Sequence, residues 1–305
     1  MNENVKIFAG YILICLLWGS TWLFIKMGLD SLSPMFSAGI RFILASGFIY
    51  TFMKFNKIKL VLNKTAYILY VLIALFSFGV PFYLVYWAES HISSGLASVL
   101  FAVFPFFVFI ISPLMIRGEK FDLFKLAGII LGFWGILIIF SENINFDLAD
   151  DFQAMVAVVI SALVQGFVAV TIKKYGKELH PLSMNFIPTL LGGVLLIMVA
   201  FLVEDYTALI FDSNAIISLL YLGLFGTVFT FTTYYWLLQR INVVILSLSA
   251  FITPIVALLL GWLILDEQFS TSDLLGASFV LSGIVMANIA GLIKYYRSRL
   301  KVKRA

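Results

Sequence analysis

The sequence predicts an all-α integral membrane protein with ten transmembrane helices in a five-plus-five inverted-topology repeat. Apolar residues make up 62% of the chain and charged residues only 12%, against about 45–50% and about 25% in ordinary soluble domains. The chain also contains ten apolar runs long enough to cross a hydrocarbon layer about 30 Å thick. The third observation is that its two halves align with each other almost without gaps.

The ten runs each have the roughly 20 mostly apolar residues that a spanning helix needs. They cover residues 7–27, 34–53, 66–88, 93–116, 123–140, 154–172, 183–203, 214–238, 243–265 and 274–293. The first run is too long for a signal-peptide core and lacks a convincing small-residue cleavage site, so we expect a retained helix. Cys15 is the only cysteine, which excludes an intramolecular disulfide and a multi-cysteine metal site.

The charges predict which side of the membrane each loop faces. Because short loops rich in Lys and Arg stay in the cytoplasm, an N-in arrangement with ten crossings puts 18 of the 20 cations inside and 12 of the 16 acids outside. Both termini are then cytoplasmic. The basic tail is explained as a topology signal and a contact for anionic lipid headgroups, which we favour over a nucleic-acid contact. Lys26 and Arg41 are the two cations that break the pattern.

The internal repeat divides the chain into residues 1–145 and 146–305, with five runs in each. Five is an odd number, so the second copy must enter the membrane upside down relative to the first. An inverted repeat predicts alternating access, since one chain then has two conformations of similar energy. The matched pairs include Gly19 and Gly166, Lys26 and Lys173, Pro34 and Pro181, Trp87 and Trp236, Pro105 and Pro254, and Glu119 and Glu267.

Several local motifs carry a family resemblance. They are "WGSTW" at 18–22 followed by Lys26, Pro34 and Arg41, "SSGLASVL" at 93–100, and the paired Glu-x-Phe and glycine signatures of the fifth and tenth runs. With them the chain resembles the EamA-type transporters of the drug/metabolite transporter superfamily over residues 7–293. The resemblance implies a central cavity built mainly by helices 1, 3, 4, 6, 8 and 9. We expect the protein to be a monomer or a homodimer. It also implies export of small metabolites, amino acids or drugs across a prokaryotic plasma (inner) membrane, and it leaves the substrate open.

Arg41 and Lys26 are candidate functional cations. Arg41 lies about 10 Å along its helix from Pro34, where an arginine costs about 2.5–3.5 kcal/mol unless it faces protein or water. Arg41 either receives a substrate carboxylate or phosphate, or pairs with a structural partner such as Glu89 or a helix C-terminal carbonyl. Lys26 ends its helix and is either an interfacial anchor, with its stem in the apolar layer, or part of a gate.

Two prolines and one amide lie deep in the apolar runs. Pro105 and Pro254 each remove a backbone donor in mid-run, which leaves carbonyls to line a cavity, forms a hinge, or makes a static kink. Gln165 lies halfway along the sixth run and must face the bundle, because an unsatisfied amide is costly in lipid. It contacts either the substrate or a neighbouring helix.

Aromatic residues gather in "PFYLVYW" at 81–87 and "TFTTYYW" at 230–236, in repeat-related helices. They form either the walls of a substrate cavity or the usual interfacial belts of membrane proteins. The remaining candidate substrate-binding residues are Trp18, Ser20, Tyr83, Tyr86, Trp87, Tyr234 and Tyr235.

Missing motifs restrict the function classes. The sequence contains no H-E-x-x-H, G-x-S-x-G or G-x-x-x-x-G-K-[ST] motif, and no carboxylate in the middle third of any run. We therefore expect no catalytic residues, cofactor or metal, and a secondary carrier that exports small organic metabolites, with amino acids or related aromatic compounds favoured. A membrane-embedded enzyme and a channel are the alternatives. Proton coupling is either absent or uses Glu89, His91 or the substrate.

Overall fold

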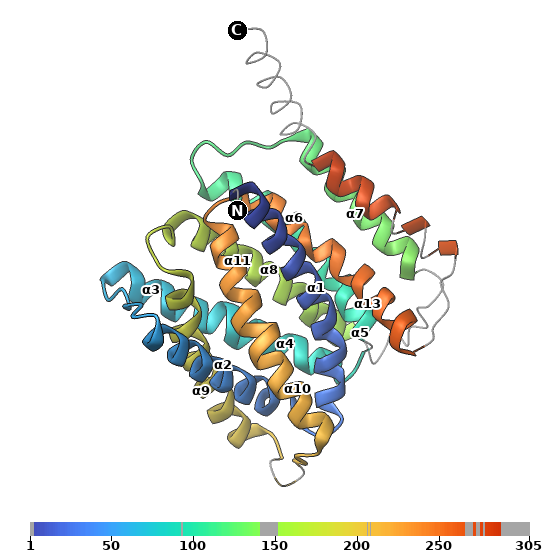
Figure 1. Ribbon diagram of the computed structural model, residues 1–305. Coiled ribbons are helices and arrows are strands. Elements are labelled where there is room, and N and C mark those ends of the chain that lie inside the picture. The colour runs from blue at the N-terminus through green and yellow to red at the C-terminus, as the bar shows by residue number, and fades with distance from the viewer. Residues whose placement is uncertain are drawn as a thin grey trace.

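The computed structural model describes residues 3–92, 94–140, 152–205, 207, 209–265, 271–272, 275–276 and 278–287. All regular secondary structure in this part of the chain is helical (Figure 1). The helices are α1 Glu3–Leu29, α2 Pro34–Phe55, α3 Lys64–Ile73, η1 Ala74–Gly79, α4 Val80–Glu89, α5 Ser94–Phe101, α6 Phe104–Met115, α7 Leu123–Phe140, α8 Phe152–Tyr175, α9 Pro181–Val203, α10 Ser213–Gly223, η3 Leu224–Phe229, α11 Thr230–Leu238, α12 Val243–Ser247 and α13 Ser249–Leu265. The last predicted run is described only in part, by the helix Ser278–Ala287 and its neighbouring residues.

Seven helical segments among the described residues are long and apolar enough to cross a membrane, and three shorter apolar helices accompany them. Large apolar side chains cover the outside of the bundle; Phe8, Leu114 and Leu202 are 68%, 73% and 82% exposed. Such a surface suits lipid, since a membrane-spanning helix satisfies its own backbone groups and needs no water. The architecture is that of a multi-pass membrane protein.

Helices α2 and α9 cross at two glycines. A Cβ added to Gly39 would lie 3.1 Å from the Gly193 carbonyl oxygen, and a Cβ added to Gly193 would lie 3.0 Å from the Gly39 carbonyl oxygen. Only glycine permits backbones to approach so closely. This contact fixes α2, and with it Arg41, against the rest of the bundle.

Two of the spanning segments contain π-helical turns. Segment Lys64–Glu89 consists of α3, η1 and α4, and segment Ser213–Leu238 consists of α10, η3 and α11. Such turns are rare and often occur at functional sites. Both lie next to the cavity described below.

Two other runs are broken between short helices. Helix α5 ends at Phe101 and α6 begins at Phe104, while α12 and α13 meet at Leu248. Pro105 therefore lies in the first turn of α6, where its missing N–H costs nothing, and not in the interior of one continuous helix as the sequence suggested. Pro254 does lie inside α13.

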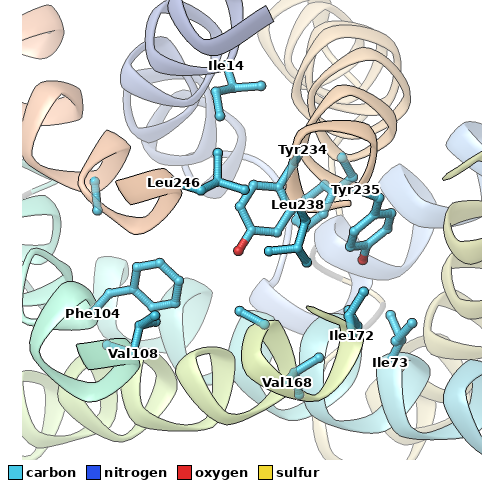
Figure 2. Packing of buried hydrophobic residues seen from close by; sticks show 14 of the residues in the cluster. Ile14, Ile73, Phe104, Val108, Val168, Ile172, Tyr234, Tyr235, Leu238 and Leu246 are labelled. Atoms are coloured by element: carbon cyan, nitrogen blue, oxygen red, sulfur yellow. The ribbon is translucent and has the colours of Figure 1, made fainter. Parts of the chain in front are cut away.

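The main core runs through the middle of the bundle (Figure 2). Tyr234 and Tyr235 extend from α11 into this core, near Ile73, Val168 and Ile172. The cavity lies within this apolar surround.

Candidate functional site

A cavity lies at the centre of the bundle and encloses about 880 Å³ of atom-free space, its mouth included. Most of the lining is aromatic or aliphatic, and a few polar groups interrupt it. The lining residues are Trp18, Thr21, Trp22, Ile25, Arg41, Ser77, Phe82, Val85, Phe101, Phe104, Ser161, Gln165, Val168, Ala169, Ile172, Phe231, Tyr234, Tyr235, Ser249, Ala250 and Thr253.

Arg41 is the cation of this lining, and its side chain is only 1% exposed. Its guanidinium donates from Nε to Thr227 Oγ1 at 2.8 Å, from Nη1 to the Tyr86 hydroxyl at 3.0 Å and from Nη2 to the Gly226 carbonyl at 3.1 Å. The ring of Phe82 lies 5.0 Å from its Cζ. None of these partners is a carboxylate, so the charge of Arg41 is solvated by dipoles and π faces but has no counter-ion among them.

The π-helical segment η3 supplies two of the three partners of Arg41. Thr227 donates its own hydroxyl to the Leu222 carbonyl at 2.9 Å, which turns its lone pair toward Arg41 Nε. Gly226 has no side chain, and a Cβ there would lie 3.1 Å from Arg41 Nη2. The local sequence thus leaves room for the guanidinium and offers it a carbonyl and a hydroxyl.

Gln165 and Ser77 form a polar pair in the lining. Ser77 Oγ donates to Gln165 Oε1 at 2.9 Å, and Gln165 Nε2 donates to the Ser77 carbonyl at 3.0 Å. The pair links α8 to η1 and also faces the cavity. The Tyr235 hydroxyl lies next to that of Ser77, and both residues line the cavity.

An aromatic wall completes the cavity. The Trp18 ring centroid lies 5.6 Å from that of Phe231 and 5.1 Å from that of Tyr234. Phe231 also lies 6.0 Å from Phe82. These rings present edges and faces to a flat or apolar group at the favourable separations of aromatic pairs.

Lys26 and Lys173 each hold the end of another helix. Lys26 Nζ donates to the Glu89 carbonyl at 2.6 Å and to the Ile92 carbonyl at 3.5 Å, beyond the last turn of α4. Lys173 Nζ donates to the Leu238 carbonyl at 2.7 Å and to the Ile241 carbonyl at 2.6 Å, at the end of α11. An ammonium group is favourable at a helix C-terminus, where carbonyls lack partners.

Four predicted binding residues do not line the cavity. Ser20 donates to the Leu17 carbonyl and shares a 2.6 Å hydrogen bond with the Tyr221 hydroxyl of α10. Tyr86 is fully buried and reaches the cavity only through Arg41.

The other two are Tyr83 and Trp87, which are half-buried on α4 outside the lining. The Trp87 ring packs 4.6 Å from the ring of His91 at the helix end. Pro105 and Pro254, the hinge candidates, are also absent from the lining, although α6 and α13 both contribute to it.

Several lining residues were missed by sequence reasoning, and helical spacing would have found some of them. Ser161 lies four residues before Gln165 on the same face of α8, and Trp22 lies four residues after Trp18 on α1. Phe82 and Phe231 lie within the two aromatic stretches already singled out. Ser77 gave no such signal, because its position depends on the π-helical turn.

Among the described residues, no group of three or more His, Cys, Asp or Glu side chains could hold a metal ion. The lining contains one guanidinium and no carboxylate. The cavity therefore offers one positive charge within a largely apolar surface.

Known proteins are similar to this chain over most of its length. The model of the EamA-like transporter family matches residues 6–141 and 152–289. The chain is 31% identical over 284 residues to the uncharacterized transporter YoaV of Bacillus subtilis (strain 168), covering 92% of this chain and 96% of YoaV. It is 29% identical to protein PagO of Salmonella typhimurium, covering 94% of each chain. The uncharacterized inner membrane transporter YedA of Escherichia coli (strain K12) is 25% identical, over 94% of this chain and 92% of YedA.

A solved crystal structure has the same fold. It matches with a TM-score of 0.80 at 14% sequence identity, over 95% of this chain and 98% of the other. At this identity the likeness concerns the fold alone.

Proposed function

Because the chain belongs to the EamA-like transporter family, and is thus an inner-membrane transporter and not an enzyme, we propose that it exports small organic metabolites by alternating access. Amino acids and related aromatic compounds are the substrate class that fits the cavity. A carboxylate binds Arg41, and the side chain of the substrate lies against the aromatic wall of Trp18, Phe231 and Tyr234.

The unused donors of Arg41 carry the proposal. A guanidinium has five N–H groups, and the three hydrogen bonds of Arg41 leave one N–H on each terminal nitrogen. Two such donors match the two oxygens of a carboxylate, in a charge-assisted pair that neutral ligands do not offer. A buried cation whose hydrogen-bond partners are all neutral also gains from an anionic ligand.

The architecture that we propose is ten transmembrane helices in a five-plus-five inverted repeat, with repeats 1–145 and 146–305 and both termini in the cytoplasm. The lysine caps support it. The acceptors of Lys26 are Glu89 and Ile92, and each lies 149 residues before the corresponding acceptor of Lys173. The π-helical segments and the helix breaks also recur once in each half. Alternating access requires two halves with equivalent contacts at opposite ends, and the lysine contacts with helix ends fit this requirement.

A binding experiment tests the substrate class. Purified protein is titrated with phenylalanine and with phenethylamine, which lacks the carboxylate, and binding is followed by thermal shift and calorimetry. We expect phenylalanine to bind and phenethylamine to bind at least roughly tenfold more weakly, since a hydrogen bond to a charged group contributes about 1.5–3 kcal/mol. Replacing Arg41 with Gln should abolish this difference, and Arg41→Lys should restore part of it.

The matched control is Arg117→Gln, an exposed arginine outside the cavity. It should bind phenylalanine like the wild type. Equal binding of the acid and the amine by the wild type would overturn the carboxylate assignment. Counterflow in proteoliposomes tests transport itself: a carrier exchanges labelled phenylalanine faster when unlabelled phenylalanine is inside, whereas a channel does not.

A further inference from the structure

Glu89 is a buried carboxylate without a partner. It is the last residue of α4, its side chain is 0% exposed, and neither carboxylate oxygen has a hydrogen-bond partner among the described residues. The two ion pairs of the described part of the chain, Lys125 with Glu119 and Arg240 with Glu3, do not include it. The cavity chemistry above does not use it.

An ionised carboxylate in this environment is costly. Removing a carboxylate from water without hydrogen bonds or a paired cation costs far more than protonating it, so a buried acid of this kind takes up a proton and becomes neutral. The buried, unpartnered position of Glu89 is therefore one that favours the protonated carboxyl group.

Cations that could pair with an ionised Glu89 are nearby but engaged elsewhere. Lys26 of α1 and Arg41 of α2 both act on it electrostatically. The Lys26 ammonium donates to backbone carbonyls, and the Arg41 guanidinium donates to hydroxyls and a carbonyl. The other titratable groups here are Tyr86 of α4 and His91 in the next turn. The packed helices α5 and α13 carry no titratable side chain among the described residues, and α8 carries none before position 173.

The position of Glu89 connects it to the cavity. Glu89 lies one turn beyond Val85 on α4, and Lys26 lies one turn beyond Trp22 on α1. Val85 and Trp22 line the cavity and also belong, together with Ile92, to an apolar cluster at this end of α4. Glu89 and Lys26 therefore lie on the path between the cavity and this face of the membrane.

The other half of the chain has no counterpart to this carboxyl. The residue equivalent to Glu89 is Leu238, whose carbonyl accepts from Lys173 as the Glu89 carbonyl accepts from Lys26. The contact of a lysine with a helix end is thus present in both halves, whereas the carboxyl group is present in one half only. A device that responds to protons is expected at that end alone.

We propose that Glu89 is a proton-binding site whose protonation permits the α1/α4/α5 end of the cavity to close. Closing takes one proton from the water at that face onto the carboxylate. Opening returns the proton to the same water, and the ionised carboxylate then pairs with the Lys26 ammonium as it leaves the helix end. The proposal deepens the transport function above, because it gives one gate of the carrier a dependence on pH.

Infrared spectroscopy of the full-length protein tests the protonation directly. At neutral pH we expect an absorption band from a protonated carboxyl group that disappears in Glu89→Gln. The matched control is Glu178→Gln, an exposed glutamate, which should leave the band unchanged. A spectrum in which Glu89→Gln also leaves the band unchanged overturns the proposal.

A labelling experiment tests the gate without any substrate. Ile92, which is 4% exposed, is replaced with Cys in a Cys15→Ala background, and its reaction with a bulky maleimide is followed from neutral to alkaline pH. The same cysteine in Glu89→Gln serves as reference, since the ratio of the two rates cancels the ionisation of the thiol itself. We expect the labelling rate with Glu89 present, divided by the rate in Glu89→Gln, to rise with pH. The rise should be up to about tenfold per pH unit, because the ionised fraction of the Glu89 carboxyl changes in that proportion.

A ratio that stays constant over this range would refute proton control of the gate. Because neither measurement needs a ligand, failure of phenylalanine to bind would count against the proposed substrate class and leave the Glu89 result interpretable. Conversely, phenylalanine transport together with a constant labelling ratio would support the carrier function and refute the proton site at Glu89.

Discussion

Alanine at two glycines of α2 is expected to change stability in opposite directions. At Gly39, an added Cβ would lie 2.5 Å from Ile197 Cγ1 and 3.1 Å from both the Gly193 carbonyl oxygen and the Ile197 nitrogen. Two of these three atoms are backbone, so α9 must move. At Gly47, an added Cβ has no neighbour within 4 Å.

The expected magnitudes follow from two opposing contributions. Glycine-to-alanine in a helix interior gains about 1 kcal/mol at either position. Forcing extra volume into a close contact costs about 1–3 kcal/mol, and only Gly39 has such a contact. Gly47→Ala should therefore be more stable than the wild type by up to about 1 kcal/mol, and Gly39→Ala should lie about 1–3 kcal/mol below Gly47→Ala.

The assay is thermal unfolding of both variants and the wild type in the same detergent micelles. Loss of helicity is followed as the temperature rises, and the midpoints are compared. Because both substitutions are chemically identical and lie on one helix, effects of detergent and of helix propensity cancel in the comparison. Equal midpoints for the two variants would refute the close crossing of α2 and α9.

Three further changes probe the cavity and the helix ends. Gly226→Ala should push the Arg41 guanidinium out of position and weaken phenylalanine binding about tenfold without changing any charge, as measured by calorimetry. Lys173→Met removes two charge-assisted hydrogen bonds and should lower the unfolding free energy by about 1.5–3 kcal/mol, whereas Lys174→Met, at an exposed position, should change it by less than about 0.5 kcal/mol. At Asp212, hydrogen bonds from the first-turn N–H of α10 and from a serine hydroxyl hold the carboxyl pKa below its ordinary 3.8. The ionised form thus adds stability above that pH, which is lost as the pH falls through the lowered pKa, so Asp212→Asn should flatten the acid limb of the midpoint against pH.

Each of these has an outcome that counts against it. Wild-type phenylalanine affinity in Gly226→Ala would mean that the guanidinium tolerates displacement. Equal unfolding free energies for Lys173→Met and Lys174→Met would mean that the hydrogen bonds of Lys173 to the end of α11 do not stabilise the protein. An unchanged acid limb in Asp212→Asn would assign the acid sensitivity to other carboxyls.

Helix positions were largely predictable because apolar length determines them. The predicted run 123–140 has the bounds of α7, and the runs near α8 and α9 agree to within a few residues. The helix breaks were not predictable, since the chain on both sides of Leu248 is equally apolar. Such breaks depend on packing against neighbouring helices, which a one-dimensional hydropathy pattern does not contain.

The residues of the cavity lining were predictable where the side chain would be costly in contact with lipid. Arg41 and Gln165 were singled out because charge and amide groups must avoid lipid, and both line the cavity. Aromatic rings are favourable in cavities, cores and interfaces alike, so Tyr83 and Trp87 could not be separated from Tyr234 by residue type. The partners of Arg41 were beyond prediction, because they depend on the local geometry of η3. The substrate-binding role of these residues stays a prediction.

The π-helical segments make the cavity sensitive to residue number as well as residue type. Each added or removed residue turns everything downstream in an α-helix by about 100°. Phe231 and Tyr234 follow η3, and Phe82 and Val85 follow η1. Deleting one residue from η3 would leave every side chain of α11 intact in the sequence and yet rotate its aromatic wall out of the cavity. In these two segments the number of residues therefore determines the shape of the cavity wall as much as the side chains do.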